Sequence, residues 1–377
     1  MSGERAIVTS RERVLATFEG ASVDRLPVTV LYWPLCQQDH FAEFTGRPQS
    51  ALDEWLSAEP EDHVRLWRRM AEMVPFDIVQ PQPAAAREAR EQARHRPPLG
   101  SSDTRSGHAR DYAANQIQHV FDRADVDDRA IVVPAADIIA SGVHDYREAL
   151  VAEVAETEFI LSGGVIGTLY SCGAYVGMEN TYPMLIEQPD LMDYLSWRIV
   201  EQNIEQIRTL AAAGGDAIFI DDATATSDMI SVAHYERFSL PCITEMVREI
   251  HRLGSRAILI YFGGVADRLE QIAATGADAL SMETSMKGYV DDIAEIAARV
   301  GDRLTLFGNI DPVGILERGS DEELEAEIIR QAAAGRECGR GFIICTGSPI
   351  TPGTPVSHIR RFIELAHRHG AEEATRG

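Results

Sequence analysis

Acidic and polar side chains recur where short apolar runs end in the second half of this 377-residue chain. Asp221 and Asp222 close the run AIFI, Glu283 follows ALSM, and Asn309 and Asp311 follow LTLF. Two carboxyl groups crowded into one pocket raise the pKa of one of them, which supplies a general acid at neutral pH. Alternate residues of a strand face opposite sides, so only one of the adjacent aspartates should face such a pocket. We expect that one to be Asp222, past the last buried strand residue, and we expect Asp222 and Glu283 to be catalytic.

Each of these polar residues also has a structural interpretation. Asp222 could cap the following segment or pair with an arginine, and Glu283 could belong to a structural salt bridge. Asn309 could orient a substrate or bind the backbone. Asp311 precedes Pro312 and could cap a turn.

Aromatic residues could form the walls of the same pocket. Tyr261 and Phe262 end the run AILIYF, and Trp33 follows a candidate first strand. Aromatic walls suit a flat, apolar substrate, although the same residues could be ordinary core aromatics. We count all three as candidate substrate contacts.

Eight apolar runs would position these residues. Five lie in the second half of the chain: Ala217–Asp221, Ala257–Tyr261, Ala279–Met282, Leu304–Gly308 and Gly341–Cys345. Three precede them: Val28–Leu31, Phe76–Gln80 and a strand that begins at Phe159–Leu161. Short apolar runs separated by helix-length segments are typical of buried parallel strands that alternate with helices. We therefore predict an α/β fold, a single (β/α)8 TIM-like barrel with helical additions at the N-terminus, whose chemistry lies where the strands end.

Local signals indicate where helices begin and end. The segment Asp53–Met73 is expected to be helical with an interruption at Pro60. A capping box of Ser320 and Glu323 should start a later helix, which Gly335 should stop.

The chain shows no internal boundary, so we predict one domain over residues 1–370 and a disordered tail over 371–377. Residues 87–111 are polar, rich in Arg, Gly, Ser and Pro, and lack periodicity. This composition predicts a mobile loop over the mouth of the barrel.

The composition restricts the partners. A net charge of −24 disfavours nucleic acid and anionic membrane surfaces. The N-terminal residues have no apolar signal segment, and no run is long enough to span a membrane, so a cytoplasmic location is expected. The five cysteines are scattered and should be reduced, and the lone pair Cys36 and His40 lacks the further ligands of a zinc site.

Several phrases, in this order along the chain, resemble the uroporphyrinogen decarboxylase superfamily. They are RERVLATFEGASVDRLPV, GGDAIFIDD, HYERFSLPCITEMVREIH, GADALSME, GNIDP and GFIICTGSPITPGTP. The resemblance implies a TIM-like barrel and one of two activities: decarboxylation in the haem pathway, or zinc-dependent methyl transfer to or from corrinoid proteins. It also implies that Tyr170 and Tyr175, which follow the loop Gly163–Thr168, contact the substrate.

The chain departs from both branches of the superfamily. The resemblance places the zinc ligands of the methyltransferases at Ile260, Phe262 and Ser348, and neither Ile nor Phe can coordinate a metal. We therefore predict no metal site, with Ser348 lining the pocket. The arginine-rich signature of the decarboxylases would fall within Leu31–Phe41, which contains no arginine, and their catalytic-site histidine would fall at Ser348. Uroporphyrinogen is therefore disfavoured as substrate.

These departures favour a zinc-independent methyltransferase or demethylase that acts on a small methylated compound. It would bind no cofactor tightly and would work with a separate corrinoid (cobalamin) protein. Two alternatives stay open: a decarboxylase or lyase of a small carboxylic acid, and a non-catalytic binding barrel. The oligomeric state is also open, and a homodimer is one option.

The absence of the zinc ligands leads to a direct prediction. Purified protein should carry much less than one zinc per chain, because Ile260 and Phe262 offer no donor atoms. Elemental analysis after dialysis measures this. Stoichiometric zinc would indicate a different ligand set.

Overall fold

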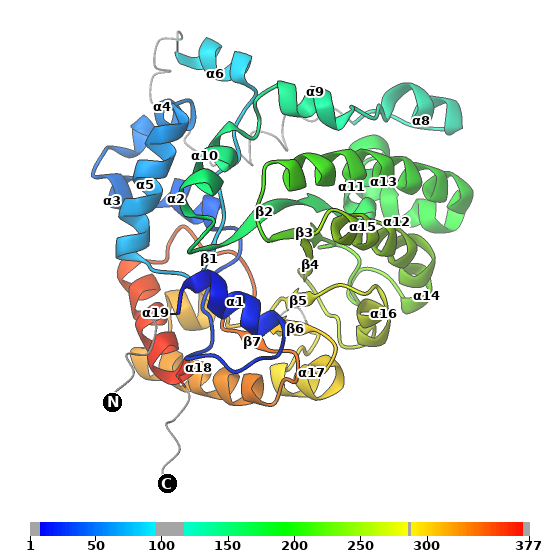
Figure 1. Ribbon diagram of the computed structural model, residues 1–377. Coiled ribbons are helices and arrows are strands. Elements are labelled where there is room, and N and C mark those ends of the chain that lie inside the picture. The colour runs from blue at the N-terminus through cyan, green and yellow to red at the C-terminus, as the bar shows by residue number, and fades with distance from the viewer. Residues whose placement is uncertain (1–7, 95–116, 286–287, 372–377) are drawn as a thin grey trace, which may run out of the picture.

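The computed structural model describes residues 8–94, 117–285 and 288–371. Within these ranges, seven parallel strands form one curled sheet in which each strand is hydrogen-bonded to the next in the sequence (Figure 1). The strands are β1 (Ile78–Val79), β2 (Phe159–Ile166), β3 (Ala217–Asp221), β4 (Arg256–Tyr261), β5 (Ala279–Met282), β6 (Thr305–Phe307) and β7 (Phe342–Ile343). The predicted α/β architecture is confirmed, and the sheet is consistent with a TIM-like barrel.

The predicted strand Val28–Leu31 is present only as an isolated bridge. Val28 pairs in parallel with Ile344, and the carbonyl of Val28 accepts a hydrogen bond of 2.9 Å from the amide of Asp77. This segment therefore lies between the β7 and β1 ends of the sheet. It stays short because Pro27 has no amide hydrogen to donate and because Tyr32 turns the chain through the left-handed region, at φ 52°.

Helices precede and separate the strands. Those before β1 are α1 (Ser10–Phe18), α2 (Trp33–Asp39), α3 (Phe41–Thr45), η1 (Gln49–Ala51), α4 (Leu52–Leu56) and α5 (Pro60–Met73). Those between β1 and β3 are α6 (Arg87–Arg94), α8 (Arg123–Arg129), α9 (Ala135–Ala140), α10 (Asp145–Val154), α11 (Thr168–Val176), α12 (Met178–Glu187) and α13 (Pro189–Ala212). Those after β3 are α14 (Val232–His234), η2 (Tyr235–Ser239), α15 (Leu240–Arg252), α16 (Leu269–Ala274), α17 (Ile293–Val300), η3 (Pro312–Glu317), α18 (Asp321–Arg336) and α19 (Val356–Gly370).

The local helix signals are mostly confirmed. The break before Pro60 separates α4 from α5, and the reciprocal capping box of Ser320 and Glu323 starts α18. Gly335 does not stop that helix, which continues to Arg336. A Cβ atom at Gly335 would lie 2.4 Å from the ring of Phe342, so this glycine serves close packing of α18 on β7.

The predicted loop over residues 87–111 is wrong at its start, where Arg87–Arg94 form helix α6. Arg90 explains this, because its guanidinium is buried and donates to the carbonyls of Ala85 and Gly142, which fixes the segment against the α9–α10 turn. The rest of that range, residues 95–111, lies outside the described residues.

Two layers of apolar side chains hold the sheet. The inner core faces the concave side and consists of Val14, Phe18, Leu31, Ile78, Phe159, Leu161, Ala217, Ile258, Ile260, Ala279, Phe307, Ile343 and Cys345. Helix α1 packs against β1, β2 and β7, and Phe18 stacks on Phe159 with ring centroids 5.6 Å apart. The first residues of the strands are therefore covered by α1, and the carboxyl ends are left for a site.

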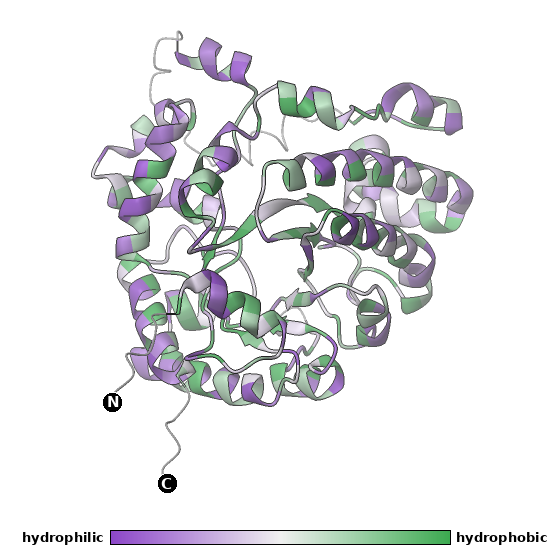
Figure 2. Cartoon of the chain, viewed as in Figure 1, coloured by the Kyte–Doolittle hydropathy of each residue, from purple (hydrophilic) through white to green (hydrophobic). Residues whose placement is uncertain are grey.

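The outer core lies between the sheet and the surrounding helices. It includes Ile218, Ile220 and Leu259, which alternate along the strands with inner-core residues. Figure 2 shows the same pattern, with hydrophobic residues in the central strands and hydrophilic residues on many outward helix faces. Within the described ranges, no helix is long and apolar enough to cross a membrane.

Candidate active site at the carboxyl ends of the strands

Strand register shows which polar residues face the inside of the sheet. Asp221 of β3 pairs with Ile260 of β4, which pairs with Ser281 of β5. Ile260 belongs to the inner core, so this row of side chains points inward. Glu283 is two residues beyond Ser281 and continues along the same face, whereas Asp222 falls on the opposite face.

Asp221 is a buried inward carboxyl group held by two hydrogen bonds. One oxygen accepts from the hydroxyl of Tyr32, and the other accepts from the amide of Ala223 at 3.1 Å. Burial raises the pKa of Asp221 to about 6, and the hydrogen bond from Tyr32 opposes that rise. Asp221 can therefore hold a proton in slightly acidic solution and release it near neutrality.

Asp222 does not face the inner side, so the orientation that we expected for this pair of aspartates is wrong. Its side chain is 1% exposed and accepts a hydrogen bond of 2.5 Å from Ser239 of η2. Burial raises its pKa to about 7, an effect that the Ser239 hydroxyl opposes. The physical reason is strand alternation, because β3 keeps its regular register through Asp221 and the next side chain points to the helices.

Glu283 lies on the inner face, as its predicted role requires. Its carboxylate accepts hydrogen bonds from Tyr289 at 2.5 Å and from Ser348 at 3.1 Å. Ser348 thus joins the end of the last strand to the end of β5. The proposed catalytic role of Glu283 and the proposed pocket role of Ser348 stay predictions.

Of the three aromatic candidates, Phe262 borders the inner face. Its ring lies 5.9 Å from that of Tyr32, which in turn lies 5.5 Å from Phe219. Tyr261 is fully buried on the helix side, where its hydroxyl is 2.8 Å from that of Tyr235. Trp33 packs edge-on against Phe76 at 5.0 Å in the outer core. Tyr261 therefore matches the alternative interpretation as a core aromatic, and Trp33 lies away from the inner face.

Asn309 and Asp311 have structural contacts. Asn309 is 3% exposed; its amide nitrogen donates to the carbonyls of Glu283 at 3.3 Å and Asp291 at 2.7 Å. It therefore holds the ends of β5 and β6 together. Asp311 caps η3 by accepting from the amides of Val313 and Gly314, both at 2.9 Å. The turn-capping interpretation of Asp311 matches the structure.

Tyr170 and Tyr175 both lie on α11 and are half-buried. The hydroxyl of Tyr175 accepts a hydrogen bond of 3.0 Å from Gln202, which fixes α11 against α13. The substrate contacts that we expected of these tyrosines stay predictions.

Two site residues were missed from the sequence. Tyr32 holds Asp221, and Tyr289 holds Glu283. Tyr32 offered a signal, since it lies beside Trp33 at the end of the first predicted strand. Tyr289 lies six residues beyond Glu283 in an irregular loop, where no periodicity predicts the direction of a side chain.

The residues at the positions where the methyltransferases of the superfamily carry zinc ligands make other contacts in this protein. Ile260 is 1% exposed in the inner core, Phe262 packs on Tyr32, and Ser348 donates to Glu283. Across the residues that the structure describes, no group of three or more His, Cys, Asp or Glu side chains is arranged to hold a metal ion.

Comparison with known proteins places this architecture in a family. The model of the uroporphyrinogen decarboxylase family matches residues 112–369, which is more than half of the chain. The chain belongs to the uroporphyrinogen decarboxylase family. The resemblance seen in the sequence is thereby confirmed.

Curated members of the uroporphyrinogen decarboxylase family are similar over about two thirds of the chain. Uroporphyrinogen decarboxylase of Tolumonas auensis is 28% identical over 267 residues, which cover 68% of this chain and 71% of that protein. The corresponding protein of Cellvibrio japonicus is 30% identical over 260 residues, 67% of this chain and 70% of its own length.

A solved structure described as a methyltransferase from Methanosarcina mazei has the same fold. It superposes with a TM-score of 0.70 at 19% identity and covers 96% of this chain and 99% of its own. At this identity the likeness shows a shared fold, and the reaction has to be argued from the site.

Proposed function

We propose that this protein is a zinc-independent methyl-transferring enzyme, which removes a methyl group from a small compound and works with a separate corrinoid protein. The observation that carries the proposal is the inward carboxyl group of Asp221, whose pKa is raised to about 6 by burial. Cleavage of a methyl–oxygen or methyl–nitrogen bond needs a proton on the leaving atom, and a buried carboxylic acid supplies one.

The inner-face residues fit this task. Asp221 would donate its proton to the leaving oxygen or nitrogen, and Tyr32 would orient that carboxyl group through its hydroxyl. Phe219 and Phe262 would limit the access of water to the acid, which favours transfer over hydrolysis. When present, the corrinoid of the partner protein would accept the methyl group.

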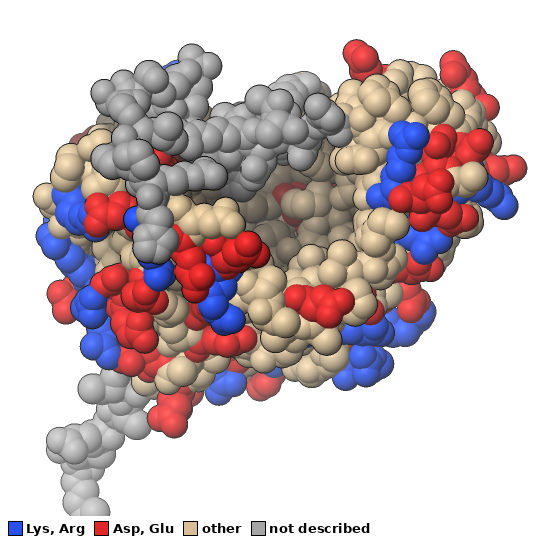
Figure 3. Space-filling view, turned by 90° about the horizontal axis from the view of Figure 1, so that it is seen from above, with Lys and Arg blue, Asp and Glu red and all other residues tan. Residues whose placement is uncertain are grey.

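The charge around the site supports a small substrate of low charge. The contacts that we describe for Asp221 and Glu283 are hydroxyl groups and one backbone amide. Figure 3 shows a hollow on one face of the molecule, whose visible wall is mostly uncharged, with acidic atoms at its depth. Binding of a porphyrinogen with many carboxylates would need cations, which Arg residues usually supply.

A second candidate is decarboxylation of a small carboxylic acid. The similar curated proteins are uroporphyrinogen decarboxylases, which favours this reaction class. Here Asp221 would protonate the carbanion that is left when carbon dioxide departs.

One assay separates these candidates. The purified protein is mixed, with and without a reduced corrinoid-binding protein, in turn with an O-methylated phenol, an N-methylated amine, small carboxylic acids and uroporphyrinogen. The expected result is methylation of the corrinoid, seen by absorbance, and release of a demethylated product. Release of carbon dioxide from small acids without corrinoid would favour the second candidate, and formation of coproporphyrinogen at an enzymatic rate would contradict both.

The Tyr32→Phe variant tests the role of Asp221 as an acid. Loss of the hydroxyl removes a hydrogen bond that favours the charged carboxylate, so the pKa of Asp221 should rise above about 6. A reaction that needs protonated Asp221 loses rate as pH rises through that pKa. The falling limb of the rate–pH profile should therefore move to higher pH in Tyr32→Phe and stay in place in Tyr289→Phe. A shift of the limb to lower pH would contradict the assignment.

A further inference from the structure

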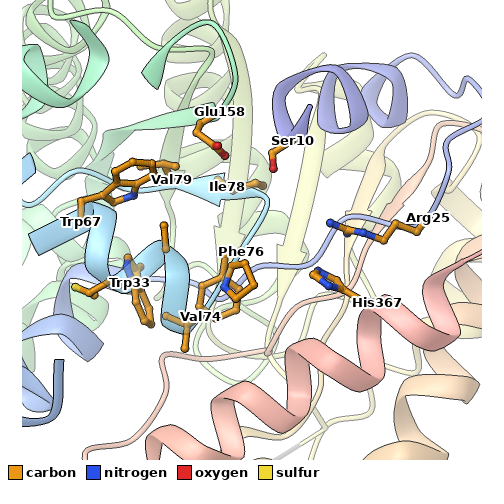
Figure 4. A pocket seen from close by; sticks show the side chains of 13 residues that line it. Ser10, Arg25, Trp33, Trp67, Val74, Phe76, Ile78, Val79, Glu158 and His367 are labelled. Carbon is orange, nitrogen blue, oxygen red and sulfur yellow. The ribbon is translucent and has the colours of Figure 1, made fainter. Parts of the chain in front are cut away.

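A separate pocket lies beside β1, between residues of α5 and α19 (Figure 4). Ser10, the first residue of α1, and Glu158, directly before β2, both border it. Neither Asp221 nor Glu283 is among the residues that border it. Its volume is about 170 Å³. A protein cavity of about 150 Å³ accommodates benzene, so this pocket has room for one aromatic ring.

One side of the pocket is aromatic. Trp33 and Trp67 lie on this side, with Phe76 between them and the opposite wall (Figure 4). Trp33 is 5% exposed and fixed edge-on to Phe76 at 5.0 Å. Rigid indole and phenyl rings present flat apolar surfaces to which another ring can pack.

The opposite side carries nitrogen donors, from Arg25 and His367 (Figure 4). The guanidinium of Arg25 is held in place by Asp77, with nitrogen–oxygen distances of 2.6 and 2.9 Å. With a third bond to the carbonyl of Leu26, these contacts use three of the five N–H donors of a guanidinium. A planar fixed guanidinium suits a carboxylate ligand.

His367 provides an independent indication of a ligand. Its Nε2 atom is shielded from solvent and has no hydrogen-bond partner among the described residues. Burial lowers the pKa of His367 to about 4, so the ring is neutral at neutral pH and one tautomer donates from Nε2. Buried polar atoms without a partner are uncommon in folded proteins, which suggests that a ligand supplies the missing acceptor.

We propose that this pocket binds a single-ring aromatic carboxylate, with its ring against Trp33 and Trp67 and its carboxylate on Arg25 and His367. A hydrocarbon ring would leave the nitrogen of His367 without an acceptor. An aromatic amine would face the positive charge of Arg25, although Glu158, which also borders the pocket, could pair with it. The proposal goes beyond the methyl-transfer function, since the pocket is separate from the inner-face carboxyl groups.

Benzoate is the probe for this proposal. Isothermal titration calorimetry of the full chain should detect one benzoate site. Trp67→Ala and His367→Leu should each weaken its affinity at least tenfold, because one removes the ring contact and the other the hydrogen-bond donor. Trp197→Ala is the matched control, since Trp197 is 45% exposed on α13, and it should bind benzoate like the wild type. Melting curves establish that each variant is folded.

Three results would overturn the proposal. The first is the absence of benzoate binding by the folded wild type. The second is tighter binding of benzylamine than of benzoate, which would assign the polar contact to Glu158. The third is benzoate binding that survives both Trp67→Ala and His367→Leu but disappears in Asp221→Asn, which would place the ligand at the carboxyl ends of the strands. If one of the two pocket variants does not fold, the other decides the test.

Discussion

Replacing Asp221 by Asn should reduce turnover by about 10²–10⁴-fold, the usual contribution of a general acid. The carboxyl group is buried on the inner face and held by Tyr32, and an amide has a similar shape but no proton to donate at neutral pH. Turnover is measured as methylation of the corrinoid under saturating substrate. The substitution should not lower thermal stability, because it removes a buried carboxyl group whose pKa is raised.

Asp222→Asn is the matched control for this result. It makes the same chemical change one residue away, on the opposite face of β3, beside Ser239. We expect its turnover to stay within about threefold of the wild type, far from the loss expected of a general acid. Equal loss of turnover in both variants would show that the aspartates act as a unit. Loss of turnover only in Asp222→Asn would support the catalytic role that the sequence predicted for Asp222.

Asp222 should instead contribute to the pH dependence of stability. Its pKa rises from 3.8 to about 7 on folding, so between these values the folded state binds more protons than the unfolded state. The contribution of Asp222 to the free energy of unfolding must then fall as pH rises through this window. The favourable contribution is fully present below pH 3.8 and lost above about pH 7. The difference between these two pKa values corresponds to about 4 kcal/mol in the free energy of unfolding.

The Asp222→Asn substitution should remove the contribution of Asp222 to the pH dependence of the free energy of unfolding. In urea unfolding, the variant should resemble the wild type near pH 4 and exceed its stability at pH 8 by up to about 4 kcal/mol. Asp302→Asn, at a side chain that is 79% exposed, is the control and should leave the profile unchanged. A variant that is less stable than the wild type at pH 8 would contradict the raised pKa.

Much of the fold could be predicted because strands and helices leave periodic signals. The apolar runs around Ile218, Ile258 and Leu280 were found because buried parallel strands are continuously hydrophobic. The segment at Val28 was predicted to be a strand but forms only an isolated bridge. Local composition does not show how many residues of a segment will pair with neighbouring strands. The helix at Arg87 was missed because its stability depends on tertiary contacts of Arg90.

The site was predicted less well than the fold. Glu283 was placed correctly on the inner face. For the aspartate pair, the sequence did not show whether Asp221 or Asp222 faces inward, because a shift of one residue along β3 moves a side chain to the opposite face. The partners of the carboxyl groups were harder still. Tyr32 is 189 residues from Asp221, and only the folded sheet brings them together.

The left-handed backbone of Tyr32 has a consequence for laboratory evolution. A non-glycine residue at φ 52° and ψ 42° costs roughly 1–2 kcal/mol of backbone free energy. A library selected only for heat resistance should therefore accumulate Gly or Asn at this position, and those survivors would lack the hydroxyl that holds Asp221. A library selected for growth on the true substrate should keep Tyr32. The residue recovered at position 32 would thus report which of the two pressures a population had experienced.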